Sequence, residues 1–559
     1  MPSPDVEQIF QLHGDNHNGW WVGNTPKCAY DAANPVKVAY SLMCKNAWAG
    51  ACDNYGRDSW DPITVYAAIM GAQGGGQCAI GSGAPCAYSV SDDGSQEYRD
   101  CDDHSQNMWE FSLIGDISSV GNTIETLLCQ PPKARRGADA ATVSSRKGSK
   151  VPPPEAAVQA ALERVATRMS LKYNMSIAAA YYSPTLNASA AAGYTDAGLG
   201  MGTPTRRALA DDLYVWGSTT KMFTASAVLQ LVEKGAVGLD DAIAPHIDPI
   251  LNKLNGSKLA DHFIDPRIRK VTIRDLLHMT SGIGDYDAPK YSRDQFTARG
   301  RDFGPVDILV GYMPRFLEFA PGSRQRYCSS NYVLLGLVLA THVSGATSDW
   351  SAYDQLGVAP PPLHAELARS LFVDAGRCAS QTPVHGFMES YSAASLPPQD
   401  VWNVSCVGGW TAGNYVGSVA DVARFTYALY SDGEPSESAV VAADSRAHML
   451  NYTTASGGWY GGFYGMGTFN LSWAVDATGA TVAHGHVGDT YGYQSQTTYF
   501  PGDGFALAVA TNVETSSQAQ PADFTCSAYH EVRAAIQGAP PPNCTFVVPH
   551  HFIGVCTCV

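Results

Sequence analysis

A serine and a lysine stand one helical turn apart at the start of a segment that the sequence predicts to be a buried helix. Ser218 and Lys221 follow Trp216-Gly217, and residues 224–232 would be apolar on nearly every side of a helix. Such a helix is expected inside a core, and residues three positions apart share one of its faces. Packing gives no reason for a hydroxyl and an amine there. The pair is therefore a candidate catalytic site, and the free N–H groups of the helix N-terminus would be available to stabilise an oxyanion.

The pair needs support from the rest of the chain. A Ser-x-x-Lys match is expected about once by chance in a chain of this length. A second match, Ser144 and Lys147, lies within residues 131–154, which are rich in proline, serine and basic residues and show no periodicity. This stretch predicts a flexible linker, which offers no scaffold for a site.

The chain has 559 residues, too many for one hydrophobic core, so two or three domains are expected. Its formal charge of −16 argues against nucleic acid or an anionic membrane surface as the main partner. No apolar run reaches the roughly 18 residues of a membrane span. Changes of pattern predict a cysteine-rich unit at 1–130, the linker at 131–154, a main domain at 155–540 and a cysteine-containing tail at 541–559.

Fourteen cysteines favour disulfides, because no Cys-x-x-Cys pair has His or Cys partners at a zinc-binding spacing. Seven Asn-x-Ser/Thr sequons indicate a secreted or lumenal glycoprotein; they begin at Asn174, Asn187, Asn255, Asn403, Asn451, Asn470 and Asn543. Residues 1–7 lack the basic and apolar regions of a signal peptide. Either the chain begins inside a longer protein, which we favour, or the protein is cytoplasmic with reduced cysteines.

Residues 1–130 loosely resemble the C-terminal part of nucleoside hydrolase-like proteins, in which an Asp-Pro pair opens a helix beneath the sugar site. Here Asp61 and Pro62 precede a helical pattern that runs to Ile69, but Trp60 stands where that family usually has His. The family's aspartate-rich calcium-binding run is absent from this segment. A helix cap at Asp61 in a small α/β remnant is therefore favoured over residual hydrolase chemistry.

Residues 155–540 alternate between helical and strand patterns. Helices are predicted at 156–171, from Ser218 onward, at 273–283, 333–343 and 523–536, with a further helix start at 417–425. Strands are predicted at 175–182, 188–194, 494–500 and 505–511. Strands at both ends of a mostly helical middle favour an α+β fold with an antiparallel sheet and an inserted helical domain.

The serine hydroxyl needs a base before it can act as a nucleophile. Lys221 keeps its proton to about pH 10 unless it is desolvated or coupled to another group. Tyr327, just before an apolar helix, is the candidate partner, because a phenol and an ammonium group titrate in the same range. The glycine-containing segment His486-Val487-Gly488-Asp489, predicted as an edge strand, offers a backbone donor for an oxyanion.

Taken in order, these residues resemble the three motifs of the serine beta-lactamase-related hydrolases, in particular the class C beta-lactamase, D-alanyl-D-alanine carboxypeptidase and esterase group. The resemblance covers about residues 155–540. The matching segments are Ser218-x-x-Lys221, Tyr327-x-Ser329 and His486-x-Gly488, with context at Thr280-Ser281-Gly282, Pro321-Gly322, 331–336, 464–467 and Gly485. The Ser-Asp-Asn and Lys-Thr-Gly motifs of class A enzymes are absent.

The resemblance implies a beta-lactamase/transpeptidase-like fold and a covalent acyl-enzyme on an ester or peptide-like amide, with no cofactor and no metal. It implies that Ser218 is the nucleophile and that Lys221 and Tyr327 transfer protons. Ser329, His486 and Gly488 would lie at the substrate, and the backbone N–H groups of Ser218 and Asp489 would form the oxyanion hole.

Two departures from the family pattern leave an alternative open. Ser329 replaces the usual asparagine and has no amide, and Asp489 brings a carboxylate to a position where many relatives have a small residue. A carboxylate near an oxyanion is unfavourable unless it points away or pairs with a cation. The alternative is a non-catalytic binding protein that retains the fold.

Overall fold

The computed structural model divides the chain into two compact units, 1–149 and 150–559. In the first unit the structure describes only the backbone of seven short strands. In the second it describes residues 154–345, 348–389, 397–432, 439–454, 463–475, 481–515, 520–538, 541 and 544. The helix predicted from Asp61 lies outside the described residues. So does the predicted linker, except Pro154, which is the first residue of a helix.

The strands of the first unit form three small sheets. In one, β7 is central and pairs in parallel with β1 and antiparallel with β4; the others are the antiparallel pairs β2–β3 and β5–β6. The strands are β1 (Gln8–Phe10), β2 (Trp21–Val22), β3 (Arg57–Asp58), β4 (Cys78–Ile80), β5 (Ala87–Val90), β6 (Gln96–Arg99) and β7 (Met108–Leu113).

The second unit is built on one antiparallel sheet in the order β17-β18-β19-β20-β21-β22-β8-β9. Strands β8 and β9 come early in this unit and β17 to β22 come late, so the segment between β9 and β17 is inserted into the sheet domain. The strands are β8 (Ile177–Ser183), β9 (Leu186–Ala192), β17 (Thr453–Thr454), β18 (Phe463–Tyr464), β19 (Phe469–Asn470), β20 (His484–Thr490), β21 (Tyr493–Phe500) and β22 (Phe505–Thr511).

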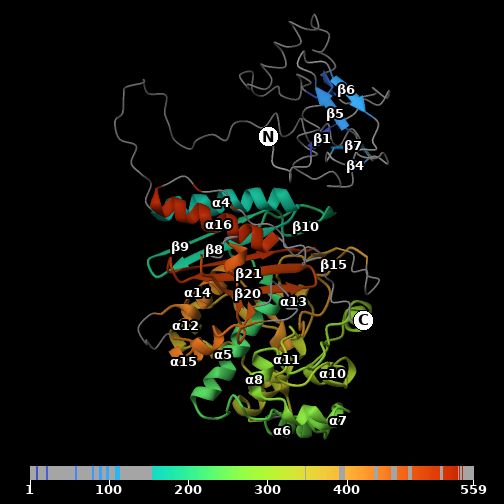
Figure 1. Cartoon of the computed structure of the whole chain (residues 1–559), viewed down its shortest axis with the longest axis vertical. Coiled ribbons are helices and arrows are strands. Elements are labelled where there is room, and N and C mark those ends of the chain that lie inside the picture. The colour runs from blue at the N-terminus through green and yellow to red at the C-terminus, as the bar shows by residue number, and fades with distance from the viewer. Residues whose placement is uncertain are drawn as a thin grey trace, which may run out of the picture. The chain divides into compact units, whose positions relative to one another are not determined.

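Helices cover both faces of this sheet (Figure 1). Helices α4 (Pro154–Tyr173) and α16 (Gln520–Gln537) pack against each other on one face, and α14 (Val419–Tyr430) packs on β8, β21 and β22 from the other. In α4 the buried positions recur at Val158, Leu162 and Val165, the spacing of one helix face. Strands β21 and β22 are buried along their whole length because both of their faces are covered.

The inserted part is mostly helical and lies on the side of the sheet that α14 covers (Figure 1). Helix α5 (Thr220–Glu233) and helix α11 (Ser329–Val343) pack together at its centre. The remaining helices are α6 (Ala244–Asn255), α7 (Leu259–His262), α8 (Ile273–Leu277), α9 (Pro289–Thr297), α10 (Pro305–Gly311), α12 (Pro361–Glu366), α13 (Cys378–Gln381) and α15 (Ala443–Met449).

Shorter strands connect the insertion to the sheet. Two three-stranded sheets have the orders β12-β16-β13 and β15-β14-β23, and β10 pairs with β11. They comprise β10 (Ala197–Gly198), β11 (Met201–Gly202), β12 (Tyr214–Val215), β13 (Ser370–Phe372), β14 (Phe387–Met388), β15 (Gln399–Asp400), β16 (Tyr415–Gly417) and β23 (Val513–Glu514). The predicted α+β architecture with a helical insertion is confirmed. Among the described helices, none is long and apolar enough to cross a membrane.

Candidate active site

Ser218 lies at the entry to α5, in a single 3₁₀ turn (Gly217–Thr219) that continues into the helix. The turn is fixed from below by Trp216, which is fully buried and donates its indole N–H to the carbonyl of Gly417 at 2.9 Å. Ser218 keeps 8% of its surface exposed, whereas the helix that follows is buried at every residue from Thr220 to Leu229. The predicted buried helix is confirmed, and its entry presents the hydroxyl to solvent.

Lys221 lies directly beneath that hydroxyl and has no exposed surface. Its Nζ lies 2.8 Å from Ser218 Oγ, 3.2 Å from Ser329 Oγ and 2.9 Å from the carbonyl oxygen of Ala412. Burial lowers the pKa of Lys221 to about 8, and the carboxylates of Asp285 and Asp287 oppose that shift. A substantial fraction of the neutral amine is therefore present near pH 8, within proton-transfer distance of the serine.

Tyr327 is brought to the same place by the loop that precedes α11. Lys221 Nζ lies 5.1 Å from the centre of its ring. Burial raises the pKa of Tyr327 well above its usual value, and hydrogen bonding to Ser218 opposes the shift. The phenol therefore stays protonated, which makes Lys221 the better base of the two.

Asp285 is a site residue that the sequence did not reveal. Its Oδ2 accepts a hydrogen bond of 2.9 Å from the backbone N–H of Ser329, the first residue of α11. Burial raises the pKa of Asp285, and its attraction to Lys221 opposes that shift. Asp285 thus fixes the start of α11 and places a negative charge near the lysine. The only sequence signal was an acid within the loop that follows Thr280-Ser281-Gly282.

Gly488 allows β20 to approach the turn that holds Ser218. A Cβ at this position would lie 1.9 Å from the carbonyl oxygen of Trp216 and 2.2 Å from Ser495 Oγ. Gly217 faces it with a φ of +51°, and a Cβ there would lie 2.7 Å from the carbonyl oxygen and 3.1 Å from the backbone nitrogen of Asp489. Backbones this close leave no room for side chains, so Gly488 acts through its size.

Replacing Gly488 with alanine is expected to push β20 away from Trp216, because the atom in its path is backbone. We expect the free energy of unfolding to fall by about 1–3 kcal/mol, with a loss of hydrolytic activity. Thermal unfolding and an ester assay measure the two effects. Gly502→Ala is the matched control, since no atom lies within 4 Å of its Cβ position; equal behaviour of the two variants would contradict the steric role.

His486 is fully buried beside the site and does not line its opening. Its Nδ1 lies 2.6 Å from the carbonyl oxygen of Val487, and its Nε2 lies 3.1 Å from the hydroxyl of Tyr464. Burial, with the nearby Lys221 charge, lowers the pKa of His486 to about 3, so the ring is neutral. On the side opposite β21, β19 pairs with His484 and Gly485, and no other described strand pairs with β20 there from His486 onward.

The carboxylate of Asp489 has a protein partner. Its Oδ1 accepts a hydrogen bond of 3.0 Å from Gln494 Nε2, the residue opposite it on β21. Asp489 and Ser329 both line a hollow of about 470 Å³ that opens at Ser218. The structure therefore brings Ser218, Ser329 and Asp489 to one opening, places Lys221 and Tyr327 beneath it, and leaves His486 behind it.

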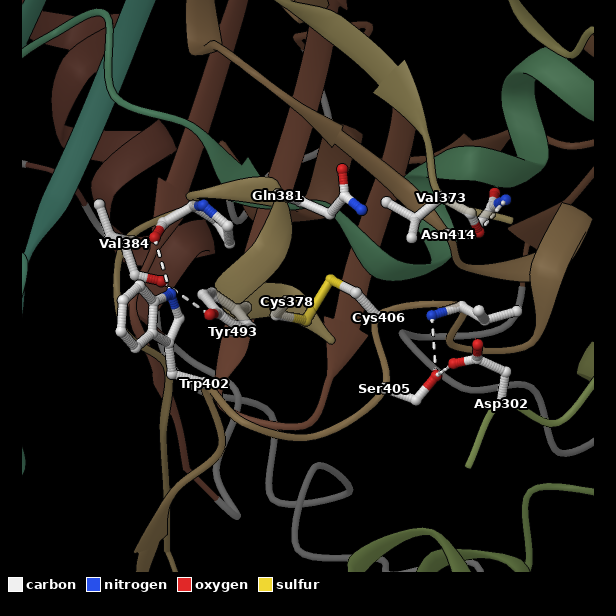
Figure 2. Close-up of a disulfide and its surroundings, with 12 residues drawn as sticks. Asp302, Val373, Cys378, Gln381, Val384, Trp402, Ser405, Cys406, Asn414 and Tyr493 are labelled. Carbon is white, nitrogen blue, oxygen red and sulfur yellow. Dashed lines mark hydrogen bonds between the residues drawn. A yellow bond between two sulfur atoms is a disulfide. The ribbon is translucent and has the colours of Figure 1, made fainter. Parts of the chain in front are cut away.

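A disulfide lies in the wall of a neighbouring hollow, and Figure 2 shows its surroundings. It joins Cys378 to Cys406, and next to it Ser405 Oγ donates a hydrogen bond of 2.6 Å to Asp302. Both cysteines line this second hollow of about 290 Å³. The two hollows share four lining residues, which are Gln295, Gly408, Thr490 and Tyr491.

The expectation that the cysteines form disulfides is confirmed for two pairs and is wrong for one residue. A second disulfide joins Cys526 and Cys544. Cys328 instead is a buried free thiol that precedes α11 and donates to the carbonyl of Ile283 at 3.2 Å. It is enclosed by packing, with no other described cysteine beside it. Among the described side chains, no three His, Cys, Asp or Glu residues gather as metal ligands.

Solved structures resemble the second unit in fold. The D-stereospecific amidohydrolase from Streptomyces sp. aligns over 69% of this chain and 100% of its own, with 22% identity and a TM-score of 0.50. The D-amino acid amidase from Ochrobactrum anthropi SV3 aligns over 69% and 99%, with 19% identity and a TM-score of 0.51. At these identities the likeness shows the fold.

Sequence comparison identifies the family. Penicillin-binding protein 4 of Amycolatopsis lactamdurans is 27% identical over 303 residues, which are 54% of this chain and 72% of that protein. Protein flp of Staphylococcus aureus (strain NCTC 8325 / PS 47) is 31% identical over 126 residues, 22% of each chain. The family model described as Beta-lactamase matches residues 177–526, more than half of the chain. The predicted relationship is confirmed: the chain belongs to the Beta-lactamase family of serine hydrolases.

Proposed function

We propose that the protein hydrolyses an ester or a small peptide-like amide through an acyl-enzyme on Ser218. The observation that carries this proposal is the 2.8 Å separation between Ser218 Oγ and the Nζ of a fully buried lysine. Burial favours the neutral amine, which is the form that accepts a proton from the serine. Family membership supplies independent support for the same reaction class.

The chemistry follows from this arrangement. Neutral Lys221 takes the Ser218 proton while Oγ attacks the substrate carbonyl, and the resulting oxyanion is stabilised by the backbone N–H groups of Ser218 and Asp489. The lysine proton then passes to the leaving group, with the Tyr327 phenol as the adjacent hydrogen-bonding group. Water repeats the sequence to release the acid. The close approach of Gly217 to the Asp489 backbone supports the oxyanion assignment.

The two departures that favoured a non-catalytic protein have structural explanations. Ser329 Oγ lies 3.2 Å from Lys221 Nζ, so the hydroxyl helps to fix the lysine. The carboxylate of Asp489 accepts a hydrogen bond from Gln494. Neither residue separates Ser218 from Lys221, and no observation favours the binding-protein alternative.

A panel of three chromogenic substrates tests the proposed function. The panel contains p-nitrophenyl acetate, a chromogenic cephalosporin and phenylalanine p-nitroanilide. We expect turnover of the ester and the anilide to exceed that of the cephalosporin, because Ser329 lacks the amide that would contact a lactam side chain. Absence of turnover with all three would contradict hydrolase activity, and fastest turnover of the cephalosporin would contradict the preference.

We also propose that the protein follows a secretory route. The two disulfides support this, because such bonds persist in oxidising compartments. Of the six sequon asparagines in the described part, five are exposed: Asn174, Asn187, Asn255, Asn403 and Asn451. A free-thiol count on unreduced protein from its native source tests the proposal; reduced Cys378 and Cys406 would contradict it.

A further inference from the structure

Three acidic side chains lie in the wall of the hollow at Ser218. Asp287, Asp489 and Glu514 all line it, together with the phenols of Tyr286, Tyr291 and Tyr491. Among the described residues that line the hollow there is no lysine, arginine or histidine. A substrate that enters therefore meets acidic side chains within the space where the serine acts.

Lys221 does not neutralise this charge through direct contact. Its three N–H donors are matched by three acceptors, which are Ser218 Oγ, Ser329 Oγ and the carbonyl of Ala412. In the part of the chain that the structure describes, no ion pair joins Asp287 or Glu514 to a basic side chain. Lys221 acts on Asp287 only through space, so neither acid has a directly bonded cationic partner among the described residues.

Both acids are nevertheless fixed in position. Asp287 Oδ1 accepts a hydrogen bond of 3.1 Å from the hydroxyl of Tyr491, which lies 2.6 Å from Ser292 Oγ. Glu514 Oε2 accepts a hydrogen bond of 2.8 Å from the backbone N–H of Gly492. Each carboxylate keeps a second oxygen for which the described residues supply no donor, so each can accept from a ligand.

Gln295 gives an independent indication of a ligand that donates hydrogen bonds. Its side chain is only 2% exposed and lines both hollows. Its Nε2 donates to the carbonyl of Ser405, whereas its Oε1 is buried with no donor among the described residues. An unpaired buried acceptor is costly unless a ligand supplies the hydrogen.

The electrostatics of the hollow also favour a ligand that carries a positive charge. Asp287 lines the hollow and is exposed to solvent, so its carboxylate is accessible to a ligand. Burial and the nearby Asp489 raise the pKa of Glu514 well above its usual value. Crowded carboxylates resist ionisation, and a cation placed between them would restore their charged forms.

We propose that this hollow binds the protonated amine of the substrate, so that the preferred substrates are amides or esters of amino acids with a free amino group. This inference rests on the proposed function, because it names the substrate class of the same serine. Asp287 and Glu514 receive the ammonium group, and Gln295 Oε1 accepts one of its hydrogens. An ammonium group is favoured over a metal ion because the described residues contain no cluster of three potential metal ligands.

Binding to the Ser218→Ala variant tests the proposal without requiring catalysis. Isothermal titration compares phenylalanine amide, in both enantiomers, with 3-phenylpropanamide, which differs only by the amino group. At least one enantiomer is expected to bind about 10-fold or more tightly than the compound without the amine, as charge-assisted hydrogen bonds require. Equal affinities, or no measurable binding of either amine, would overturn the proposal. Calcium chloride is titrated as well. If calcium displaces phenylalanine amide and the two amides bind equally, the hollow is a metal site and the proposal is overturned.

Two substitutions test which acidic residues cause the tighter binding of the compound with the amino group. Asp287→Asn and Glu514→Gln, each made in the Ser218→Ala background, are expected to lower the ratio of the two affinities at least about threefold. Glu163→Gln is the matched control: Glu163 is an exposed acid of α4, and the ratio is expected to stay the same. A ratio unchanged in both pocket variants, or lowered equally in the control, would overturn the assignment.

These titrations, together with fluorophosphonate labelling of the wild-type protein, separate this inference from the proposed function. If Ser218 is acylated in the wild-type protein but the amine confers no advantage, the amine site is wrong and the hydrolase stands. If the Ser218→Ala variant prefers the amine but the wild-type serine is never acylated, the site stands and the hydrolase proposal fails.

Discussion

Replacement of Ser218 with alanine is expected to lower kcat for ester and amide hydrolysis by at least about 1,000-fold. The variant loses the hydroxyl that lies 2.8 Å from Lys221 Nζ at the open end of the hollow. Residual turnover would come from the oxyanion donors and substrate positioning alone. Initial rates with p-nitrophenyl acetate and phenylalanine p-nitroanilide measure the loss.

The control for Ser218→Ala lies on the same helix. Ser226 is also buried, but its hydroxyl donates to the carbonyl of Met222 within α5. Ser226→Ala removes a buried serine hydroxyl without touching the hollow, so its kcat is expected to stay close to that of the wild type. A loss of similar size in both variants would show that the effect comes from damage to α5.

Replacement of Lys221 with methionine is expected to lower kcat/KM by about 100- to 10,000-fold, the usual contribution of a general base. Methionine keeps most of the buried volume, and removal of a buried charge need not destabilise the fold. Steady-state kinetics and thermal unfolding together separate the two effects. Lys234→Met, at the exposed C-terminal end of α5, is the control and should retain activity.

The pH profile gives the sign of the lysine's contribution. The pKa of Lys221 is lowered to about 8, so the amine is protonated and inactive as a base below that pH. In the wild type, kcat/KM should therefore rise with pH up to about 8 and then level off. The Lys221→Met variant should lack this rise. A wild-type rate that is flat from pH 6 to 9 would contradict Lys221 as the base.

A double substitution tests whether the two residues act as one unit. If Lys221 serves only to activate Ser218, the variant that carries both Ser218→Ala and Lys221→Met should be no slower than Ser218→Ala alone. Additive losses would indicate that the lysine contributes through a separate route, such as leaving-group protonation or structural support.

The sequence predicted the part of the site that depends on local geometry and on motif order. Ser218 and Lys221 are one turn apart on a single helix, so the 3.6-residue period alone places them on one face. Tyr327 was found through its position before the apolar helix α11. The main strands and helices followed from periodicity, because both faces of the sheet are covered and the core patterns are strong.

The rest of the site depends on tertiary packing that periodicity does not encode. Asp285 and Asp287 come from a loop without helical or strand pattern, and Glu514 comes from the two-residue strand β23. The acceptor from Ala412 is a backbone carbonyl, which no residue type identifies. Gly488 was predicted to lie at the substrate and oxyanion position, and the structure adds that its missing side chain lets β20 meet the Ser218 turn.

The site's second layer also differs from what motif order suggested. His486 occupies the third motif, yet it is buried and neutral beside Tyr464 and lies outside the lining of the hollow. A motif fixes the position of the backbone, while the side chain turns toward the space that packing leaves. For this reason the polar lining of the hollow could be read only from the folded chain.

The most direct measurement is the location of a covalent adduct. The wild-type protein and Ser218→Ala are each treated with a reporter fluorophosphonate, digested and analysed by mass spectrometry. We expect one modified peptide in the wild type, with the added mass on Ser218, and no modification of that peptide in the variant. An unmodified Ser218 in folded wild-type protein, or labelling of another serine that persists in Ser218→Ala, would contradict a nucleophile at this position.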